Sequence, residues 1–101
     1  MFVSSKKPFF IAEISANHCG SLSIAKKLIR ISKKYGADAV KLQTYTADTM
    51  TIKSDKSCFK IQNGSSWDGF TYYDLYKEAY TPWDWHHDLF DIARQEGLIC
   101  F

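Results

Sequence analysis

The sequence lacks the features of several specialised classes of protein. No apolar run approaches the roughly 18 residues that a membrane-spanning helix needs. The opening residues, Met1 to Lys7, lack the apolar segment of a signal peptide. Basic residues number 13 and acidic residues 11, so the formal net charge of +2 favours no nucleic-acid partner. We therefore expect neither a membrane nor a nucleic acid among its partners.

Cysteine is scarce, and its spacing suits neither pairing nor metal binding. Cys19, Cys58 and Cys100 form no close-spaced pair, and neither CxxC nor HxxxH occurs. An odd, scattered set of cysteines without a secretion signal indicates free thiols in a reducing compartment, the cytoplasm. His86 and His87 are adjacent on a predicted helix, where side chains point about 100° apart, so we do not expect them to share a metal.

The chain is also short. Its 101 residues are far fewer than the about 250 of a complete (β/α)8 barrel. Its composition is nevertheless that of an ordinary globular protein, with 46% hydrophobic and 24% charged residues. If the chain belongs to such a fold, it is a piece of one.

Alternating strand and helix patterns predict an α/β fold. An apolar run over residues 9–14 predicts a buried strand, and residues 39–44 predict a second. Apolar residues at helical spacing predict a helix between them, with Ser21 as its N-cap and Gly36 past its end. This βαβ unit predicts two parallel strands.

The second half predicts a long connection and then a third strand. Residues 46–70 show no periodicity, and connections this long are often functional. A short helix is expected over residues 72–79, and another with Thr81 as N-cap and Pro82 at its first position. Residues 98–101 follow as a strand without a closing helix. We interpret the chain as the opening of a larger α/β fold.

Strand alternation places three polar side chains together. Glu13 in the first strand, with Lys41 and Gln43 in the second, should point away from the helices, near the carboxyl ends of parallel strands. Ligands bind at that end of α/β sheets. Two interpretations are open: an ion pair that only satisfies both charges, or a site. In a site, the lysine could bind a phosphate or carboxylate, and the glutamate could act as general acid or base.

Further candidates lie in the loops. Asn17 and His18 belong to the first strand–helix loop on the same rim, although a loop histidine is more often a hydrogen-bonding scaffold residue. Nine of the 16 aromatic residues fall between Trp67 and Phe90. We expect most of them to pack, and a minority, with Asp68, to form a lid over the site.

Two motifs in this order resemble the sialic acid synthase family. Residues 11–22, IAEISANHCGSL, resemble its AEI-x-x-NHNGSL opening, and residues 36–44, GADAVKLQT, resemble its GADAVK-x-QT segment. Residues 44–51, 67–69 and 73–83 are similar to the pseudaminic acid synthase branch. The resemblance runs from about Pro8 to the last residue.

The resemblance implies a (β/α)8 barrel enzyme with a small C-terminal antifreeze-like domain. Residues 1–101 would be the N-terminal part of the barrel, about three βα units, with the rest of the barrel and the second domain absent. Such enzymes condense phosphoenolpyruvate with an open-chain amino sugar, which in this branch is 2,4-diacetamido-2,4,6-trideoxy-L-altrose. The enol carbon attacks the aldehyde, water adds at C2, and phosphate leaves by C–O cleavage. A divalent metal (Mn²⁺, Mg²⁺ or Co²⁺) and a homodimer are implied for the full-length enzyme.

The resemblance also assigns roles to residues. By position, Glu13 matches the catalytic glutamate, Lys41 a lysine that binds phosphoenolpyruvate, and Gln43 a glutamine that contacts the sugar. Asn17 and His18 match the loop motif and are grouped with the substrate-binding residues.

Some family features match loosely or not at all. Asp68 is a loosely aligned candidate for the sugar-binding loop. Cys19 departs from the family, which usually has asparagine there. The family's metal-binding histidines, a second phosphate-binding lysine and an arginine from a partner subunit have no counterpart in this chain.

Two alternatives stay open at this point. One is a sibling enzyme, an N-acetylneuraminate or legionaminic acid synthase. The other, of a different class, is a truncated, non-catalytic remnant or binding domain that keeps half of the site. The coding DNA beyond Phe101 separates the second alternative from the enzyme.

Overall fold

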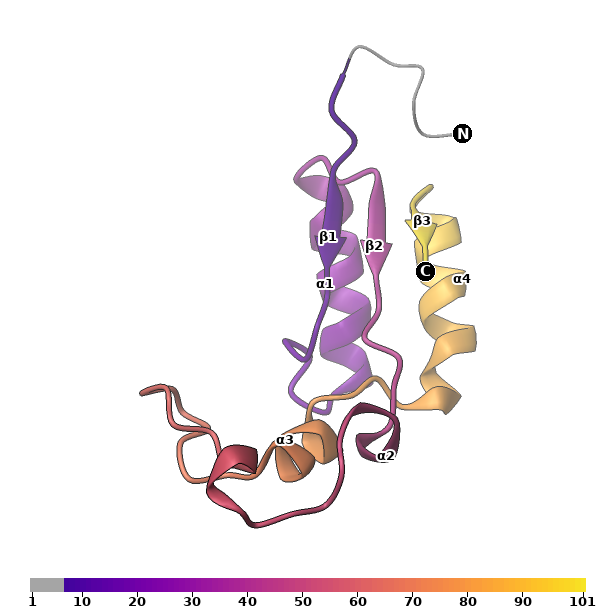
Figure 1. Ribbon diagram of the computed structural model, residues 1–101. Helices are drawn as coiled ribbons and strands as arrows, with labels where there is room; N and C mark the ends of the chain where they lie inside the picture. The colour runs from indigo at the N-terminus through magenta and orange to yellow at the C-terminus, as the bar shows by residue number, and fades with distance from the viewer. Residues whose placement is uncertain (1–6) are drawn as a thin grey trace.

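The computed structural model describes residues 7–101 and contains a small parallel sheet with two helices along one side (Figure 1). Residues 1–6 lie outside the described residues. They make up most of the segment, Met1 to Lys7, in which the sequence shows no apolar part of a signal peptide. The elements are β1 (Ile11–Glu13), α1 (Leu22–Lys34), β2 (Ala39–Lys41), α2 (Ala47–Met50), the 3-10 turn η1 (Ser57–Phe59), α3 (Tyr72–Glu78), the 3-10 turn η2 (Trp83–Trp85), α4 (His86–Gln95) and β3 (Ile99–Cys100).

The three strands lie in the order β1-β2-β3, and both pairs are parallel, so the predicted βαβ unit is confirmed. In the register, Ile11 and Glu13 pair with Ala39 and Lys41 of β2. The strands are shorter than predicted. The second strand stops early because Gln43 makes its backbone hydrogen bond with Thr81 instead of with a strand.

Helix α1 begins and ends where the sequence predicts. The Ser21 hydroxyl accepts a hydrogen bond from the Ile24 amide, as an N-cap residue does. Gly36 follows the helix with a φ of 93°, a conformation that glycine adopts without strain. Ala25 and Ile29 are fully buried against the sheet, which fixes the helix on it.

The start of α4 differs from the prediction. A 3-10 turn at Trp83–Trp85 precedes the helix, which begins at His86, and Thr81 caps neither. The Thr81 hydroxyl instead accepts a hydrogen bond from the Gln43 amide at 3.3 Å, and the Thr81 amide donates to the Gln43 carbonyl at 2.9 Å. The expectation of a Thr81 N-cap was wrong because this long-range pairing uses the hydroxyl.

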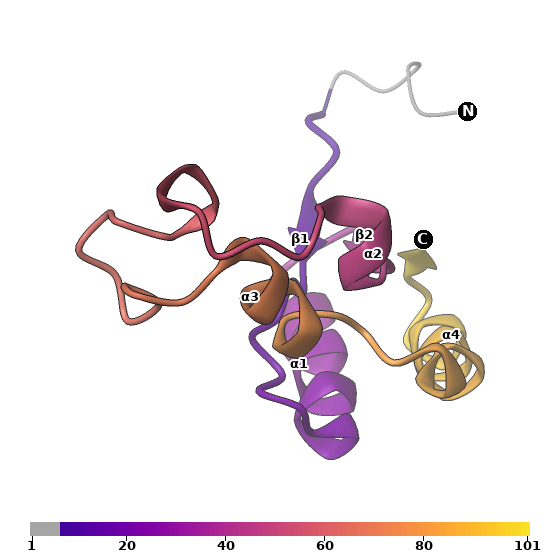
Figure 2. The ribbon, with the colours of Figure 1, turned by 60° about the horizontal axis from the view of Figure 1, so that its bottom comes forward.

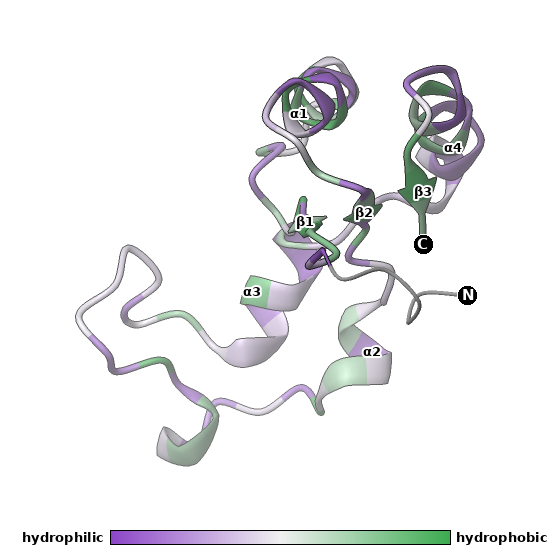
Figure 3. Ribbon diagram, turned by 90° about the horizontal axis from the view of Figure 1, so that it is seen from above, coloured by the Kyte–Doolittle hydropathy of each residue, from purple (hydrophilic) through white to green (hydrophobic). Residues whose placement is uncertain are grey.

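The core lies between the sheet and the helices α1 and α4, which share one side of it (Figure 3). Val40 and Leu42 face these helices, and Leu89 of α4 is fully buried against them. Strand alternation predicts that Phe10 shares the packed face with Ala12 and Ile14, but Phe10 is 59% exposed. It lies before β1, where it lines a surface hollow with Tyr35 at the end of α1.

The long connection contains more structure than predicted. It holds the single turn α2 and the turn η1, and Lys60 forms an isolated bridge with Thr71. The predicted α3 is confirmed, with Thr71 as its N-cap. Helices α2 and α3 lie beyond the carboxyl ends of the strands, and the chain between them projects away from the sheet (Figures 1 and 2). Within residues 7–101, no helix is long and apolar enough to cross a membrane.

Candidate active site

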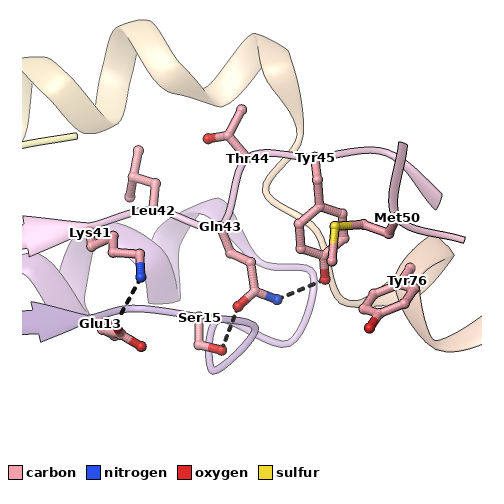
Figure 4. Close-up of a pocket in the computed structure, with 9 residues that line it drawn as sticks. All are labelled: Glu13, Ser15, Lys41, Leu42, Gln43, Thr44, Tyr45, Met50 and Tyr76. Carbon is pink, nitrogen blue, oxygen red and sulfur yellow. Dashed lines mark hydrogen bonds and ion pairs between the residues drawn. The ribbon is translucent and has the colours of Figure 1, made fainter. Parts of the chain in front are cut away.

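A cavity of about 380 Å³ opens at the carboxyl ends of β1 and β2 (Figure 4). The two strands, the residues that follow them, α2 and α3 all contribute to its wall. The lining residues are Glu13, Ser15, Lys41, Leu42, Gln43, Thr44, Tyr45, Met50 and Tyr76. The predicted site residues Glu13, Lys41 and Gln43 therefore meet in one cavity, at the end of the sheet where α/β proteins bind ligands.

Glu13 and Lys41 form an ion pair in this cavity. Parallel register places them opposite one another, with the Lys41 Nζ 2.9 Å from the Glu13 Oε1. The side chains are 66% and 49% exposed, on the face of the sheet that α1 and α4 leave uncovered. Exposed pairs contribute about 0–1 kcal/mol, so either charge can turn to a ligand at little cost.

Gln43 is held by three side-chain hydrogen bonds. Its Oε1 accepts from the Ser15 hydroxyl at 2.9 Å. Its Nε2 donates to the Tyr45 hydroxyl at 2.7 Å and to the Ala79 carbonyl at 2.8 Å. Tyr45 in turn donates to the same carbonyl. Burial is the main cause that raises the pKa of Tyr45, so its hydroxyl keeps its proton.

Asn17 and His18 lie in the loop after β1 but do not line the cavity. The Asn17 side chain donates to the Ile14 carbonyl at 3.1 Å. His18 is 1% exposed, and its Nδ1 accepts from the Gly20 amide at 3.1 Å. Its ring packs edge-on against Trp85, with ring centroids 5.2 Å apart, and burial lowers its pKa. In this structure both side chains hold the loop.

Asp68 also lies apart from the cavity. Its carboxylate accepts hydrogen bonds from the amides of Asn63, at 2.9 Å, and Gly64, at 3.1 Å. It therefore shapes the turn at the tip of the projecting connection. A contact between Asp68 and a sugar stays a prediction.

Six residues of the cavity wall were not predicted as site residues: Ser15, Leu42, Thr44, Tyr45, Met50 and Tyr76. Ser15 lies two residues after Glu13, and Tyr45 lies two residues after Gln43. Because alternate residues of a strand share a face, strand alternation could have predicted both of them. Met50 belongs to α2 and Tyr76 to α3. No pattern in the sequence predicts that these helices lie at the ends of the strands.

The chemistry of this cavity is that of an anion and polar-ligand site. Lysine supplies a positive charge, glutamate a proton acceptor, and Gln43 and Tyr45 supply polar hydrogen-bonding groups. Within residues 7–101, no three His, Cys, Asp or Glu side chains lie close enough together to hold a metal ion.

Comparisons with known proteins place the chain in a family. Residues 28–101 match the NeuB family. The chain is 52% identical, over 99% of its length, to the pseudaminic acid synthase of Campylobacter jejuni. It is 49% identical, over 97% of its length, to the N-acetylneuraminate-9-phosphate synthase of Mus musculus. It spans 29% and 27% of the lengths of these two relatives.

A solved structure is similar as well. The crystal structure of the spore coat polysaccharide biosynthesis protein SpsE from Bacillus subtilis superposes with a TM-score of 0.63 and 28% identity. The match covers the whole chain and 26% of that structure. The predicted fold class, the N-terminal portion of a (β/α)8 barrel, is thereby confirmed. Motifs, sheet and comparisons lead to the same conclusion: the chain belongs to the NeuB family.

Proposed function

We propose that the chain is the N-terminal part of a pseudaminic acid synthase, a transferase that forms a carbon–carbon bond. The observation that carries the proposal is the similarity of nearly the whole chain to such an enzyme. The cavity supports it, because Glu13, Lys41 and Gln43, three of the residues that match the family's motifs, line it together. The full-length enzyme would condense phosphoenolpyruvate with 2,4-diacetamido-2,4,6-trideoxy-L-altrose to give pseudaminic acid and phosphate.

The residues at the strand ends would have separate roles in substrate binding and proton transfer. Lys41 would bind the phosphate or carboxylate of phosphoenolpyruvate, because an ammonium group forms strong, charge-assisted hydrogen bonds with such anions. The Glu13 carboxylate lies 2.9 Å from the Lys41 ammonium. Once Lys41 binds the substrate, Glu13 would be released from this ion pair and would transfer a proton or orient water at the reacting carbons. Gln43 would contact the sugar. Asn17, His18 and Asp68 would support the loops around the substrates.

The chain would hold only part of the active site. The remaining barrel strands, the metal ligands, a second phosphate-binding lysine and the antifreeze-like domain would lie in the rest of the full-length protein. The metal would be Mn²⁺, Mg²⁺ or Co²⁺, the enzyme would be a homodimer in the cytoplasm, and the fragment alone would be inactive.

The alternative is a sibling synthase for N-acetylneuraminic or legionaminic acid. The similarity to the mouse N-acetylneuraminate-9-phosphate synthase supports this alternative. The test is phosphate release by the full-length protein, measured with phosphoenolpyruvate and each of the three sugar aldehydes. The proposal predicts the highest kcat/KM for the diacetamido-trideoxy sugar. A preference for another sugar would assign the sibling activity, and no turnover with any would refute synthase function. A stop codon after Phe101 in the coding DNA would leave only a non-catalytic domain.

A further inference from the structure

The amide of Gln43 can adopt only one orientation in the cavity. Its Nε2 lies 2.8 Å from the Ala79 carbonyl oxygen, a group that only accepts hydrogen bonds. A flipped amide would bring two acceptor oxygens together at that position, with a repulsive result. The end of the amide that faces Ala79 is therefore the nitrogen.

Tyr45 and Ser15 secure the same orientation from both sides. Tyr45 donates its proton to the Ala79 carbonyl, so its oxygen is left to accept from the Gln43 Nε2 at 2.7 Å. On the other side, the Ser15 hydroxyl donates to the Gln43 Oε1 at 2.9 Å (Figure 4). Both amide hydrogens are thereby used, and one lone pair of the oxygen is left for a ligand.

The backbone conformation of Ser15 favours its hydrogen bond with Gln43. Ser15 has a φ of 53°, in the left-handed region that residues other than glycine and asparagine rarely adopt. That conformation turns the chain sharply after β1 and places the hydroxyl beside Gln43, 28 residues away in sequence. A strained residue with a specific hydrogen bond at a cavity wall indicates a functional role.

We propose that Ser15 and Tyr45 are positioning residues that fix the Gln43 amide so that its oxygen accepts a hydrogen bond from a donor group of the sugar. The donor would be a hydroxyl or an acetamido N–H. The inference rests on the proposed function, because it concerns the sugar that the full-length synthase would bind.

The test measures KM for each substrate in the full-length protein carrying Ser15→Ala or Tyr45→Phe. Each variant removes one hydrogen bond to Gln43, so we expect KM for the sugar to rise roughly threefold to tenfold. KM for phosphoenolpyruvate should stay within about twofold, because the Lys41 ammonium is held by Glu13 and not through the Gln43 amide. Tyr72→Phe, on an exposed part of α3, is the matched control and should leave both constants unchanged.

A second arm separates positioning from a general loss of structure. In a Gln43→Ala background, Ser15→Ala and Tyr45→Phe should raise KM for the sugar no further, because they act through the missing amide. Ser15→Gly, which suits the positive φ and also lacks the hydroxyl, should raise KM as Ser15→Ala does.

The outcomes are distinct. Wild-type turnover with an unchanged sugar KM in the Ser15 and Tyr45 variants overturns this inference alone. An equal rise in both KM values, or a full effect in the Gln43→Ala background, overturns it too. No product from the wild-type protein with any of the three sugars overturns the proposed function, and the inference with it.

Discussion

Replacing Glu13 by glutamine separates a catalytic role from a structural one. The change removes the negative charge and keeps the size of the side chain. Glu13 is 66% exposed and Lys41 is 49% exposed, with 2.9 Å between their charged atoms. A pair this exposed contributes about 0–1 kcal/mol, so Glu13→Gln should lower the free energy of unfolding by less than about 1 kcal/mol.

Activity should respond very differently. A positioned general acid or base contributes about 100-fold to 10 000-fold to the rate, so kcat for phosphate release should fall by that factor. The assay is phosphate release from phosphoenolpyruvate and the sugar by the full-length protein, with urea unfolding measured in parallel.

A matched control removes a comparable ion pair elsewhere. Glu96 pairs with Arg30 at 3.7 Å, and their side chains are 34% and 54% exposed. Glu96→Gln should therefore cost as little stability as Glu13→Gln, and it should leave kcat unchanged. Wild-type turnover in Glu13→Gln would refute the catalytic role. A large loss of stability in that variant would show instead that the pair is mainly structural.

Three further substitutions probe the phosphate site and the loop after β1. Lys41→Ala should raise KM for phosphoenolpyruvate about tenfold or more and KM for the sugar less, because a charged hydrogen bond is lost; equal effects in steady-state kinetics would contradict this. Burial lowers the pKa of His18, so the unfolded chain takes up its proton first and the free energy of unfolding should fall as the pH drops below about 6.5. Urea unfolding should show a weaker pH dependence in His18→Gln than in wild type, and the same dependence in both would count against the buried neutral ring. Cys19 has a φ of 48°, which asparagine tolerates better, so Cys19→Asn should raise the unfolding free energy by up to about 1 kcal/mol. Cys58→Asn, at an exposed position, should give no such gain in the same urea experiment.

The fold was predictable wherever the signal is local. Ser21 and Gly36 mark the ends of α1 through their own side-chain and backbone chemistry, and alternation in β1 and β2 places Glu13 beside Lys41. Helix α2 escaped prediction because a single turn of four residues is too short to show periodicity.

The rest depends on contacts between distant segments. Thr81 has the sequence of an N-cap, yet its hydroxyl pairs with Gln43, 38 residues away. The fixed amide of Gln43 needs the Ala79 carbonyl, 36 residues away. Such contacts form only when α3 and the chain after it reach the strand ends, and no local pattern in the sequence encodes that approach.

The most direct test of the central claim is a crystal structure of the full-length protein with phosphoenolpyruvate and the reduced, unreactive form of the sugar. We expect the Lys41 Nζ to lie within hydrogen-bonding distance of the phosphate or carboxylate of phosphoenolpyruvate. The Gln43 Oε1 should accept a hydrogen bond from the sugar. Both ligands bound away from the carboxyl ends of β1 and β2, with Lys41 still paired only to Glu13, would contradict the assignment of this cavity as the substrate site.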